Sequence, residues 1–279
     1  MTARQALQEA RERLEAACVP DARLDARLLL AAVLDRPQLD VLATPQLPLN
    51  QAQAARFFEW VSRRAAREPL QYILGQAHFM GHAFTVRPGV LIPRSDSETL
   101  ARLAIERAVP GCQALDLCCG SGALGISLKL ARPDARVSAC DISQQAVALT
   151  RENAQRLGAG LDVRLGDLFA PFSGLLFDLI VCNPPYVPVG ELDTLQPEVR
   201  HEPPLALDGG ADGLAFYQRI IAQAPAFLKP GGWLLLEVGD GQAKAVEGLL
   251  GPDFAPSRVH PDLAGLPRAL ETRRAGGVN

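Results

Sequence analysis

The segment Ala114-Leu-Asp-Leu-Cys-Cys-Gly-Ser-Gly-Ala-Leu-Gly125 carries the strongest structural signal in this chain. Its first four residues predict a buried strand, and the glycine-rich turn after them leads into an apolar stretch with helical spacing over 122–131. Gly120 and Gly122 allow the backbone to approach a ligand closely, at a helix N-terminus whose free N–H groups favour a carboxylate or a phosphate. This order of elements predicts a ligand site in an open α/β sheet.

Strand and helix signals continue to alternate along the rest of the chain. Strands are expected at 114–117, 137–140, 161–163, 177–182 and 233–238, and helices at 122–131, 143–157, 213–228 and 241–250. Strands separated by helices of this length imply right-handed crossovers, so we expect a doubly wound, mainly parallel sheet. Another helix is expected from Ser95 to about Ala108, with Ser95 or Asp96 as its cap and Glu98 in a capping-box role.

The first 75 residues have a different pattern. Apolar residues recur at helical spacing, as in Ala6, Ala10 and Leu14, and prolines interrupt the helices. Residues 76–92 change to strand period and contain a Pro88-Gly89 turn, which predicts a β-hairpin. We therefore expect a helical domain over 1–75, a linking hairpin over 76–92 and an α/β domain over 93–279.

The composition is that of an ordinary globular protein, with 48% hydrophobic and 21% charged residues. The formal net charge of −3 provides no overall basic field for nucleic acid or anionic membranes. No apolar run approaches the length of a membrane span, the first residues do not resemble a secretory signal, and the six cysteines contain no Cys-x-x-Cys pair. These features lead us to expect a cytoplasmic protein.

Asn183-Pro-Pro-Tyr186 follows the apolar run 177–182, where a buried strand should end. Two successive prolines remove two N–H donors and fix two φ angles, so the nearby carbonyls cannot join a regular ladder. The Asn183 side-chain oxygen and the Pro184 carbonyl could then accept both hydrogens of a planar NH2 group. Taken alone, the same four residues also fit a rigid turn.

Three aspartates are placed where cofactor contacts are expected. Asp141 ends the next strand, about 20 residues after the glycine loop, a sequence spacing typical of a ribose contact. Asp167 follows the third strand, where an adenine amine would lie. A strand-end carboxylate and a solvated turn are the simpler interpretations of these two residues. The glycine pattern up to Gly125 also fits a nicotinamide or flavin enzyme, but Asp116 favours a ligand that carries an ammonium group.

Together, the glycine loop, the spaced aspartates and Asn183-Pro-Pro-Tyr186 resemble class I S-adenosylmethionine-dependent methyltransferases that modify amide or exocyclic nitrogen. Further segments resemble the bacterial glutamine methyltransferases of peptide chain release factors, the HemK/PrmC family. These segments are Glu68-Pro-Leu-Gln-Tyr-Ile-Leu-Gly75, Leu91-Ile-Pro-Arg-Ser-Asp-Ser-Glu98, His201-Glu-Pro-Pro-Leu-Ala-Leu-Asp-Gly-Gly-Ala-Asp-Gly213, Gly231-Gly-Trp-Leu-Leu-Leu-Glu-Val238 and Asp262-Leu-Ala-Gly-Leu-Pro-Arg268.

The resemblance implies a Rossmann-like, seven-stranded catalytic domain that transfers a methyl group from S-adenosylmethionine, leaving S-adenosylhomocysteine. The acceptor would be the amide nitrogen of the glutamine in the Gly-Gly-Gln motif of class 1 release factors. The helical domain would recognise that protein, and we expect a monomer with no metal, direct nucleic-acid contact or membrane contact. The implied catalytic residues are Asn183, Pro184 and Tyr186, and Pro185 joins them in binding substrate. The implied cofactor-binding residues are Asp116, Cys118, Cys119, Gly120, Ser121, Gly122, Asp141, Asp167, Leu168 and Asn183.

Two alternative acceptors fit the same motif: the glutamine of a large-subunit ribosomal protein, and an adenine or cytosine amine of nucleic acid. The chain also departs from the family pattern at Cys118 and Cys119, where glycine and threonine are usual, and at Leu168, where some members have tryptophan. Cys118, Cys119, Cys140 and Cys182 all end neighbouring strands, so a second hypothesis is that they gather around the cofactor.

Overall fold

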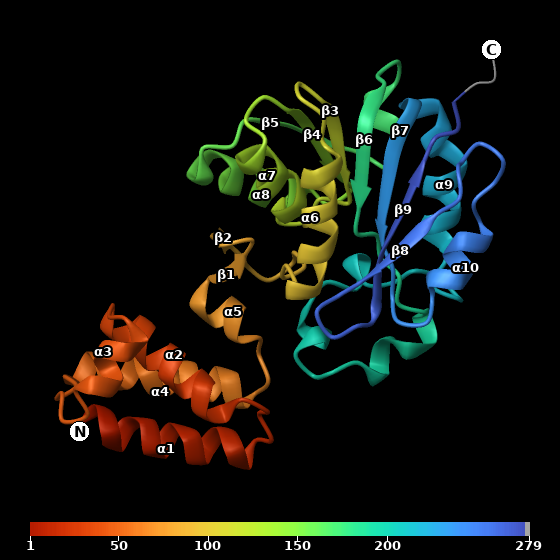
Figure 1. The fold of residues 1–279 in the computed structure, drawn as a ribbon. Coiled ribbons are helices and arrows are strands. Elements are labelled where there is room, and N and C mark those ends of the chain that lie inside the picture. The colour runs from red at the N-terminus through yellow and green to blue at the C-terminus, as the bar shows by residue number, and fades with distance from the viewer. Residues whose placement is uncertain (277–279) are drawn as a thin grey trace. The chain divides into compact units, whose positions relative to one another are not determined.

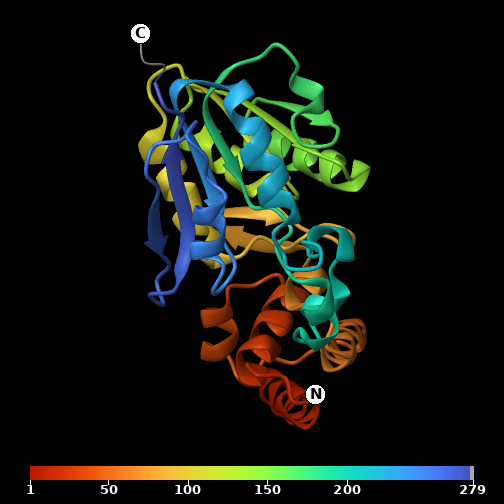
Figure 2. The ribbon, with the colours of Figure 1, turned by 90° about the vertical axis from the view of Figure 1, so that its right-hand side faces the viewer.

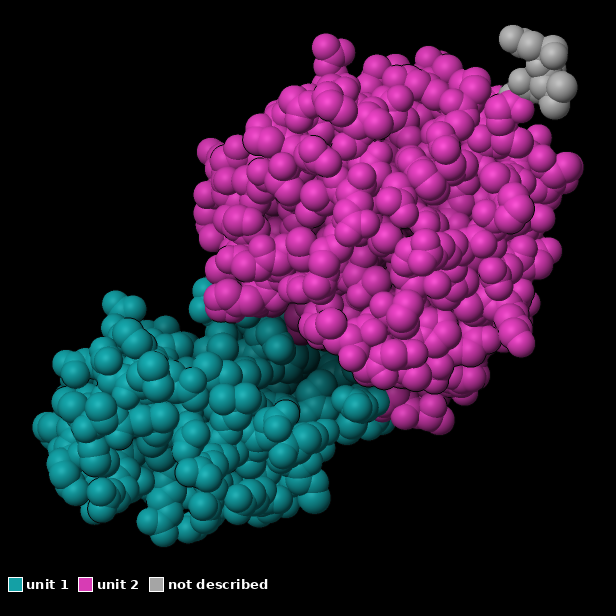
Figure 3. Space-filling view, in the orientation of Figure 1, with its two compact units in different colours: residues 1–76, 196–201 teal, residues 77–195, 202–279 magenta. Residues whose placement is uncertain are grey.

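The computed structural model describes residues 1–276 and separates the chain into two compact units (Figure 3). Unit 1 comprises Met1–Gln76 together with Gln196–His201, and unit 2 comprises Ala77–Leu195 and the chain from Glu202 onward. The short segment 196–201 is therefore separated in sequence from the rest of its unit. None of the helices within the described residues has the length and apolar character needed to cross a membrane.

Unit 1 is a helical bundle made of α1 (Ala3–Ala16), α2 (Ala22–Leu34), α3 (Gln38–Ala43), α4 (Gln51–Ala65) and α5 (Leu70–Leu74). Thr2 and Asn50 start α1 and α4 with complete capping boxes, in which the side chain of the third helical residue binds back to the cap. Small alanines on α1 and α2 pack closely around larger residues such as Leu14, Leu29 and Phe57, which are fully buried.

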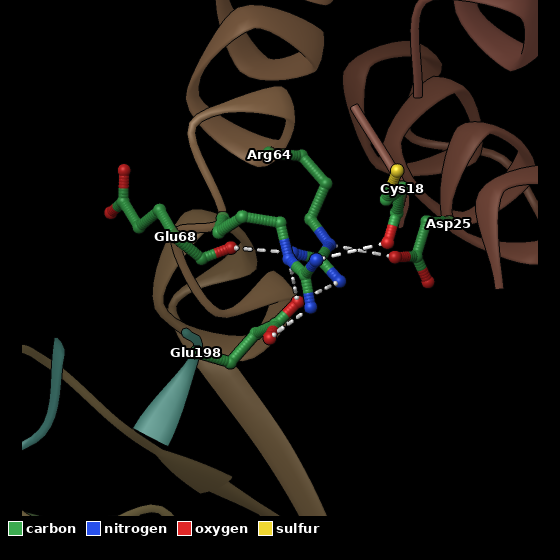
Figure 4. A network of polar contacts seen from close by, with 6 residues as sticks. Cys18, Asp25, Arg64, Glu68 and Glu198 are labelled. Atoms are coloured by element: carbon green, nitrogen blue, oxygen red, sulfur yellow. Dashed lines mark hydrogen bonds and ion pairs between the residues drawn. The ribbon is translucent and has the colours of Figure 1, made fainter. Parts of the chain in front are cut away.

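A buried ion network holds segment 196–201 within unit 1 (Figure 4). Arg64 donates through Nε to Asp25 at 2.7 Å and through Nη2 to Glu198 at 2.8 Å. Arg67 forms two further bonds to Glu198, at 2.7 and 2.6 Å. These two guanidinium groups outweigh the effect of burial and lower the pKa of Glu198 to about 2, so the carboxylate is ionised throughout the physiological pH range.

Unit 2 contains a seven-stranded sheet with the strand order β5-β4-β3-β6-β7-β9-β8 (Figure 1). Five strands run parallel, and β9 joins β7 and β8 antiparallel. The parallel strands are β3 (Gln113–Leu117), β4 (Arg136–Asp141), β5 (Leu161–Leu165), β6 (Phe177–Cys182) and β7 (Leu228–Glu237). The antiparallel edge is made of β8 (Arg258–Pro261) and β9 (Pro267–Arg273).

Helices cover both faces of this sheet (Figures 1 and 2). On one face lie α6 (Glu98–Arg107), α7 (Ala123–Ala131) and α8 (Gln144–Leu157), and on the other lie α9 (Ala215–Phe227) and α10 (Ala243–Gly248). Alternate residues of β6 enter the two apolar cores: Leu179 and Val181 pack on the first face, and Ile180 packs on the second. The predicted doubly wound fold with a seven-stranded sheet is therefore confirmed.

The hairpin before the sheet departs from the expected details. It is formed by β1 (Gln76–Phe79) and β2 (His82–Thr85), and its turn lies at Met80-Gly81 rather than at Pro88-Gly89. Met80 and Gly81 have φ angles of 50° and 79°, the geometry of a type I′ turn, whose twist suits a two-residue hairpin. The Pro88-Gly89 turn leads instead into an extended segment that reaches the site described below.

The expected capping box before α6 is not formed. A short 3-10 turn, Ser95–Ser97, precedes the helix, and no side chain caps it. The Glu98 side chain accepts a hydrogen bond from the backbone N–H of Met80 at 2.9 Å instead. The Glu98 side chain therefore makes a tertiary contact with the hairpin, in place of the local capping contact that the sequence suggested.

Candidate active site

A cavity of about 180 Å³ lies in unit 2 at the carboxyl ends of the parallel strands. Its walls include the residues that follow β3, β4, β5 and β6. The strand order reverses between β3 and β6, because β4 and β5 lie to one side of β3 and the later strands lie to the other. Such a switch point leaves a crevice between neighbouring loops, where open α/β sheets bind their ligands.

The loop after β3 forms one wall of the cavity. Cys118, Cys119, Gly120 and Ser121 all line it, whereas Gly122 does not. Gly122 has a φ of 81°, and a Cβ there would lie 2.8 Å from both Ile126 and Thr150, so only glycine fits. Cys118 adopts a positive φ of 56°, so a non-glycine residue holds the left-handed conformation at a position where the family usually has glycine.

Asp116 lies beneath this loop rather than in the wall of the cavity. Its carboxylate is 1% exposed, and Oδ2 accepts the backbone N–H of Gly125 at 2.8 Å, near the start of α7. Oδ1 is fully buried and has no hydrogen-bond partner among the described residues. Burial raises the pKa of Asp116 to about 7. A buried carboxylate with one unpaired oxygen is unusual at a core position.

Asp141, at the end of β4, and Leu168, which follows β5, also line the cavity. Asp141 accepts N–H bonds from Gly120 and Ser143, both at 2.9 Å, while burial raises its pKa despite these bonds. Leu168 is 4% exposed, and its carbonyl accepts a bond from the Cys140 thiol at 3.0 Å. The Asp141 carboxylate is thus held in one orientation by hydrogen bonds from Gly120, in the loop after β3, and from Ser143.

Asp167 also lines the cavity but is exposed. Its Oδ2 accepts a hydrogen bond of 2.6 Å from Arg219 on α9, which lines the cavity as well. The exposed apolar side chain of Ile142 and the ring of Phe216 belong to the same lining. The site therefore combines a few polar groups with flat apolar surfaces, as small-molecule sites usually do.

Asn183 brings the motif after β6 into the cavity wall, together with Pro185. Its Nδ2 donates to the Ser97 hydroxyl oxygen at 3.3 Å. Ser97 is 4% exposed and also lines the cavity. Burial raises the pKa of Glu237, and a hydrogen bond with the Ser97 side chain opposes that rise. When Glu237 is ionised it can only accept, so Ser97 then donates to it and receives the Asn183 amide hydrogen. This arrangement leaves Oδ1 of Asn183 available as an acceptor.

Glu237, at the end of β7, is 1% exposed and is a second buried carboxylate close to the site. Desolvation raises its pKa to about 7, against the influence of Ser97 and the charge of Arg268. Its Oε2 has no hydrogen-bond partner within the described part of the chain. Sequence reasoning missed Ser97 and Glu237, although both fall inside the segments that carried the family resemblance.

Pro184 and Tyr186 do not line the cavity. Pro184 is buried, and the Tyr186 carbonyl accepts a bond of 2.8 Å from Gln242. The Tyr186 ring lies close to Gly239, because a Cβ added there would be 3.0 Å from Cδ2 of the ring. Burial raises the pKa of Tyr186 to about 12, so its hydroxyl stays protonated. The tyrosine ring therefore packs near Gly239 in the loop after β7, and its contact with the substrate amide stays a prediction.

Three of the four strand-end cysteines, Cys118, Cys119 and Cys140, line the cavity. Cys182 is fully buried and lies beside Cys118. Burial raises the pKa of Cys119, Cys140 and Cys182, so these three stay protonated thiols with little nucleophilic character. These three pack as small buried side chains at or just after the ends of β3, β4 and β6, and their gathering around the cofactor stays a prediction.

Comparison with known proteins identifies both parts of the chain. The PrmC N-terminal domain family matches residues 5–75, and the methyltransferase small domain family matches residues 97–196. Among solved structures, a T. thermophilus 16S rRNA methyltransferase in complex with AdoMet and guanosine aligns with a TM-score of 0.55 and 23% identity, covering 71% of this chain and 49% of that one. That likeness concerns the fold alone.

Curated relatives are much more similar in sequence. The release factor glutamine methyltransferase of Moorella thermoacetica is 45% identical over 97% of this chain and 98% of its own length. That of Geobacter sulfurreducens is 46% identical over 83% of this chain and 82% of its own length. The resemblance predicted from the motifs is confirmed: the chain belongs to the release factor glutamine methyltransferase family.

Proposed function

We propose that this protein transfers a methyl group from S-adenosylmethionine to the side-chain amide nitrogen of the glutamine in the Gly-Gly-Gln motif of class 1 release factors. The observation that carries the proposal is the Asn183 amide, which lies in the cavity wall with its nitrogen engaged by Ser97 and its oxygen free to accept. The 45% identity to a release factor glutamine methyltransferase over 97% of the chain supports the choice of acceptor.

The residues around the cavity suit the proposed methyl donor. The Asp116 carboxylate lies beneath the glycine loop with Oδ1 unpaired, so its charge favours a positively charged ammonium group held above that loop. The Asp141 carboxylate faces the cavity as a fixed acceptor for a diol, and Leu168 with Ile142 offers apolar contact for a flat ring. When bound, S-adenosylmethionine supplies an electrophilic methyl group on a sulfonium, so the protein needs no metal for activation.

An amide nitrogen is a poor nucleophile because its lone pair is delocalised into the carbonyl. Two acceptors that hold both N–H hydrogens would favour electron density on nitrogen and fix the direction of attack. We assign this role to Oδ1 of Asn183, in the cavity wall, and to the carbonyl of Pro184, which lies in the chain between the two lining residues Asn183 and Pro185. Neither proline of the motif has an N–H that could compete. The N–C bond forms as the S–C bond of the sulfonium breaks, S-adenosylhomocysteine leaves, and the methylated nitrogen then releases one proton to water. Catalysis is then a matter of positioning and preorganised electrostatics, with no base required before transfer.

Ser97 and Glu237 act as positioning residues in this scheme. A rotated Asn183 amide would point NH2 at the substrate NH2, a pairing of two donors that binds poorly and activates nothing. The hydroxyl of Ser97 prevents that rotation as long as its own hydrogen goes to Glu237. Tyr186 contributes by holding the motif against the loop after β7, through the bond from Gln242 to its carbonyl.

The proposal is tested by offering labelled S-adenosylmethionine and the protein to four acceptors: a class 1 release factor, the same factor with its Gly-Gly-Gln glutamine replaced, large-subunit ribosomal protein, and DNA. Label on the intact release factor alone is expected. Equal label on the glutamine-replaced factor, or preferential label on either of the other acceptors, would refute the assignment.

A further inference from the structure

A second hollow, of about 480 Å³, lies entirely within unit 1, among α1, α2 and the segment around α3. Four arginines line it: Arg4 and Arg11 from α1, and Arg23 and Arg27 from α2. Helical spacing brings them together, because the residues of each pair are seven and four positions apart and so share one face of their helix. The hollow is thus a concentration of positive charge on a chain whose net charge is −3.

Most of this charge is not neutralised locally. Among the described residues, Arg4, Arg23 and Arg27 have no carboxylate within ion-pairing distance, and only Arg11 has one, Glu15 at 3.3 Å. Elsewhere in unit 1 the pattern is the reverse, since the arginines near the end of α4 are bound to carboxylates. Like charges gathered without counter-charges repel one another, so a group of unpaired arginines around a hollow favours an external anionic partner.

Apart from Gln8, the other residues that line the hollow are apolar, and they are called its apolar base below. Leu7, Ala26, Val41, Leu42 and Pro45 contribute to its lining, and Leu42 is 39% exposed. The backbone N–H of Arg4 donates to the Pro45 carbonyl at 2.9 Å, and the neighbouring N–H of Ala3 donates to Leu47 at 2.9 Å. These bonds tie the start of α1 to the segment after α3, so the walls are already in place before any partner arrives.

We infer that this hollow, defined by Arg4, Arg11, Arg23 and Arg27 above an apolar base, docks an acidic segment of the methyl-accepting protein, at a distance from the glutamine that is modified. The inference rests on the proposed function and adds a recognition surface to it. Guanidinium groups bind carboxylates in bidentate fashion, and the apolar base suits a hydrophobic side chain flanking the acidic residues. A nucleic-acid backbone would gain little from that base, which is why an acidic protein segment is favoured.

The test compares two substrates of the intact enzyme: whole release factor, which carries any docking segment, and a short peptide that contains only the Gly-Gly-Gln motif. The double variant Arg23→Glu/Arg27→Glu reverses two charges of the hollow. Arg36→Glu is the matched control, because Arg36 is also exposed on unit 1 and lies outside the hollow. Arg27→Gln, a milder variant, removes one charge without adding an opposite one.

The inference predicts that KM for whole release factor rises about tenfold in the double variant and less in Arg27→Gln, with kcat unchanged, because docking contacts outside the reacting centre contribute to binding. Peptide kinetics and the Arg36→Glu enzyme should be unaffected. Unchanged KM for the whole factor, or an equal rise in KM with the peptide, would overturn the inference. So would a double variant whose only defect is weaker inhibition by a competing oligonucleotide. If the wild-type enzyme methylates neither substrate, the proposed function itself fails.

Discussion

Replacing Glu237 with glutamine should make the free energy of unfolding much less dependent on pH. Glu237 is buried at the end of β7, and desolvation raises its pKa from 4.5 to about 7. Between these two values the folded protein holds a proton that the unfolded chain releases. Stability therefore declines as pH rises from about 4.5 through 7, and the glutamine variant lacks this titration.

The size of the effect follows from the shift. Each unit of pKa difference is worth about 1.4 kcal/mol, so the full displacement corresponds to about 3 kcal/mol, of which about 2.5 kcal/mol falls between pH 5 and pH 8. The raised pKa of Asp116 gives both proteins a decline of the same sign. That contribution cancels when the pH dependence of the variant is subtracted from that of the wild type.

Urea unfolding at pH 5 and pH 8, followed by circular dichroism, measures the difference. We expect the wild type to lose about 2 to 3 kcal/mol more than Glu237→Gln between these pH values. Glu191→Gln, on an exposed turn, is the control and should behave as the wild type does. Parallel pH dependences for wild type and Glu237→Gln would refute the reasoning, because they would mean that Glu237 does not titrate in this range.

Three further predictions concern the site and unit 1. Ser97→Ala should lower kcat about tenfold without changing the Kd for S-adenosylmethionine, because the Asn183 amide can then rotate; Ser97→Thr should restore it, and equal kcat for all three would contradict the positioning role. Asp116→Asn should raise the Kd for S-adenosylmethionine about tenfold in calorimetry, since the negative charge beneath the glycine loop is lost, and unchanged affinity would show that Asp116 does not act on the cofactor. Glu198→Gln should cost about 2 kcal/mol of unfolding free energy at pH 7, between the values for exposed and buried pairs, with the difference disappearing as pH falls toward 2, where the lowered pKa of Glu198 lies; an equal difference at pH 7 and pH 2 would count against the ion network with Arg67.

The sequence was sufficient to predict the parallel strands of the sheet and the loops at their carboxyl ends. The strand at 177–182 was identified with its observed bounds, because a short apolar run ending in two prolines has few other structures available. Asp141, Asp167 and Asn183 came together as expected, since parallel strands that share an edge bring their final residues to the same crevice.

Features that depend on distant contacts were not predictable in this way. Ser97 reaches Asn183 across 86 positions of sequence, and nothing local in either segment indicates the contact. The edge strands β8 and β9 were missed because β8 is short and half exposed and lacks a regular alternation. Glu198 gave no sign that it belongs to the helical unit, since the arginines that hold it are more than 130 positions away.

Mapping of the methyl group by tandem mass spectrometry tests the central claim most directly. Release factor treated with S-adenosylmethionine and the wild-type protein should carry one methyl group, on the side-chain amide nitrogen of its Gly-Gly-Gln glutamine. Asn183→Ala, which retains the fold and the cofactor loop but removes the proposed acceptor, should leave that glutamine largely unmodified. A methyl group on another residue, or full modification by Asn183→Ala, would contradict the account.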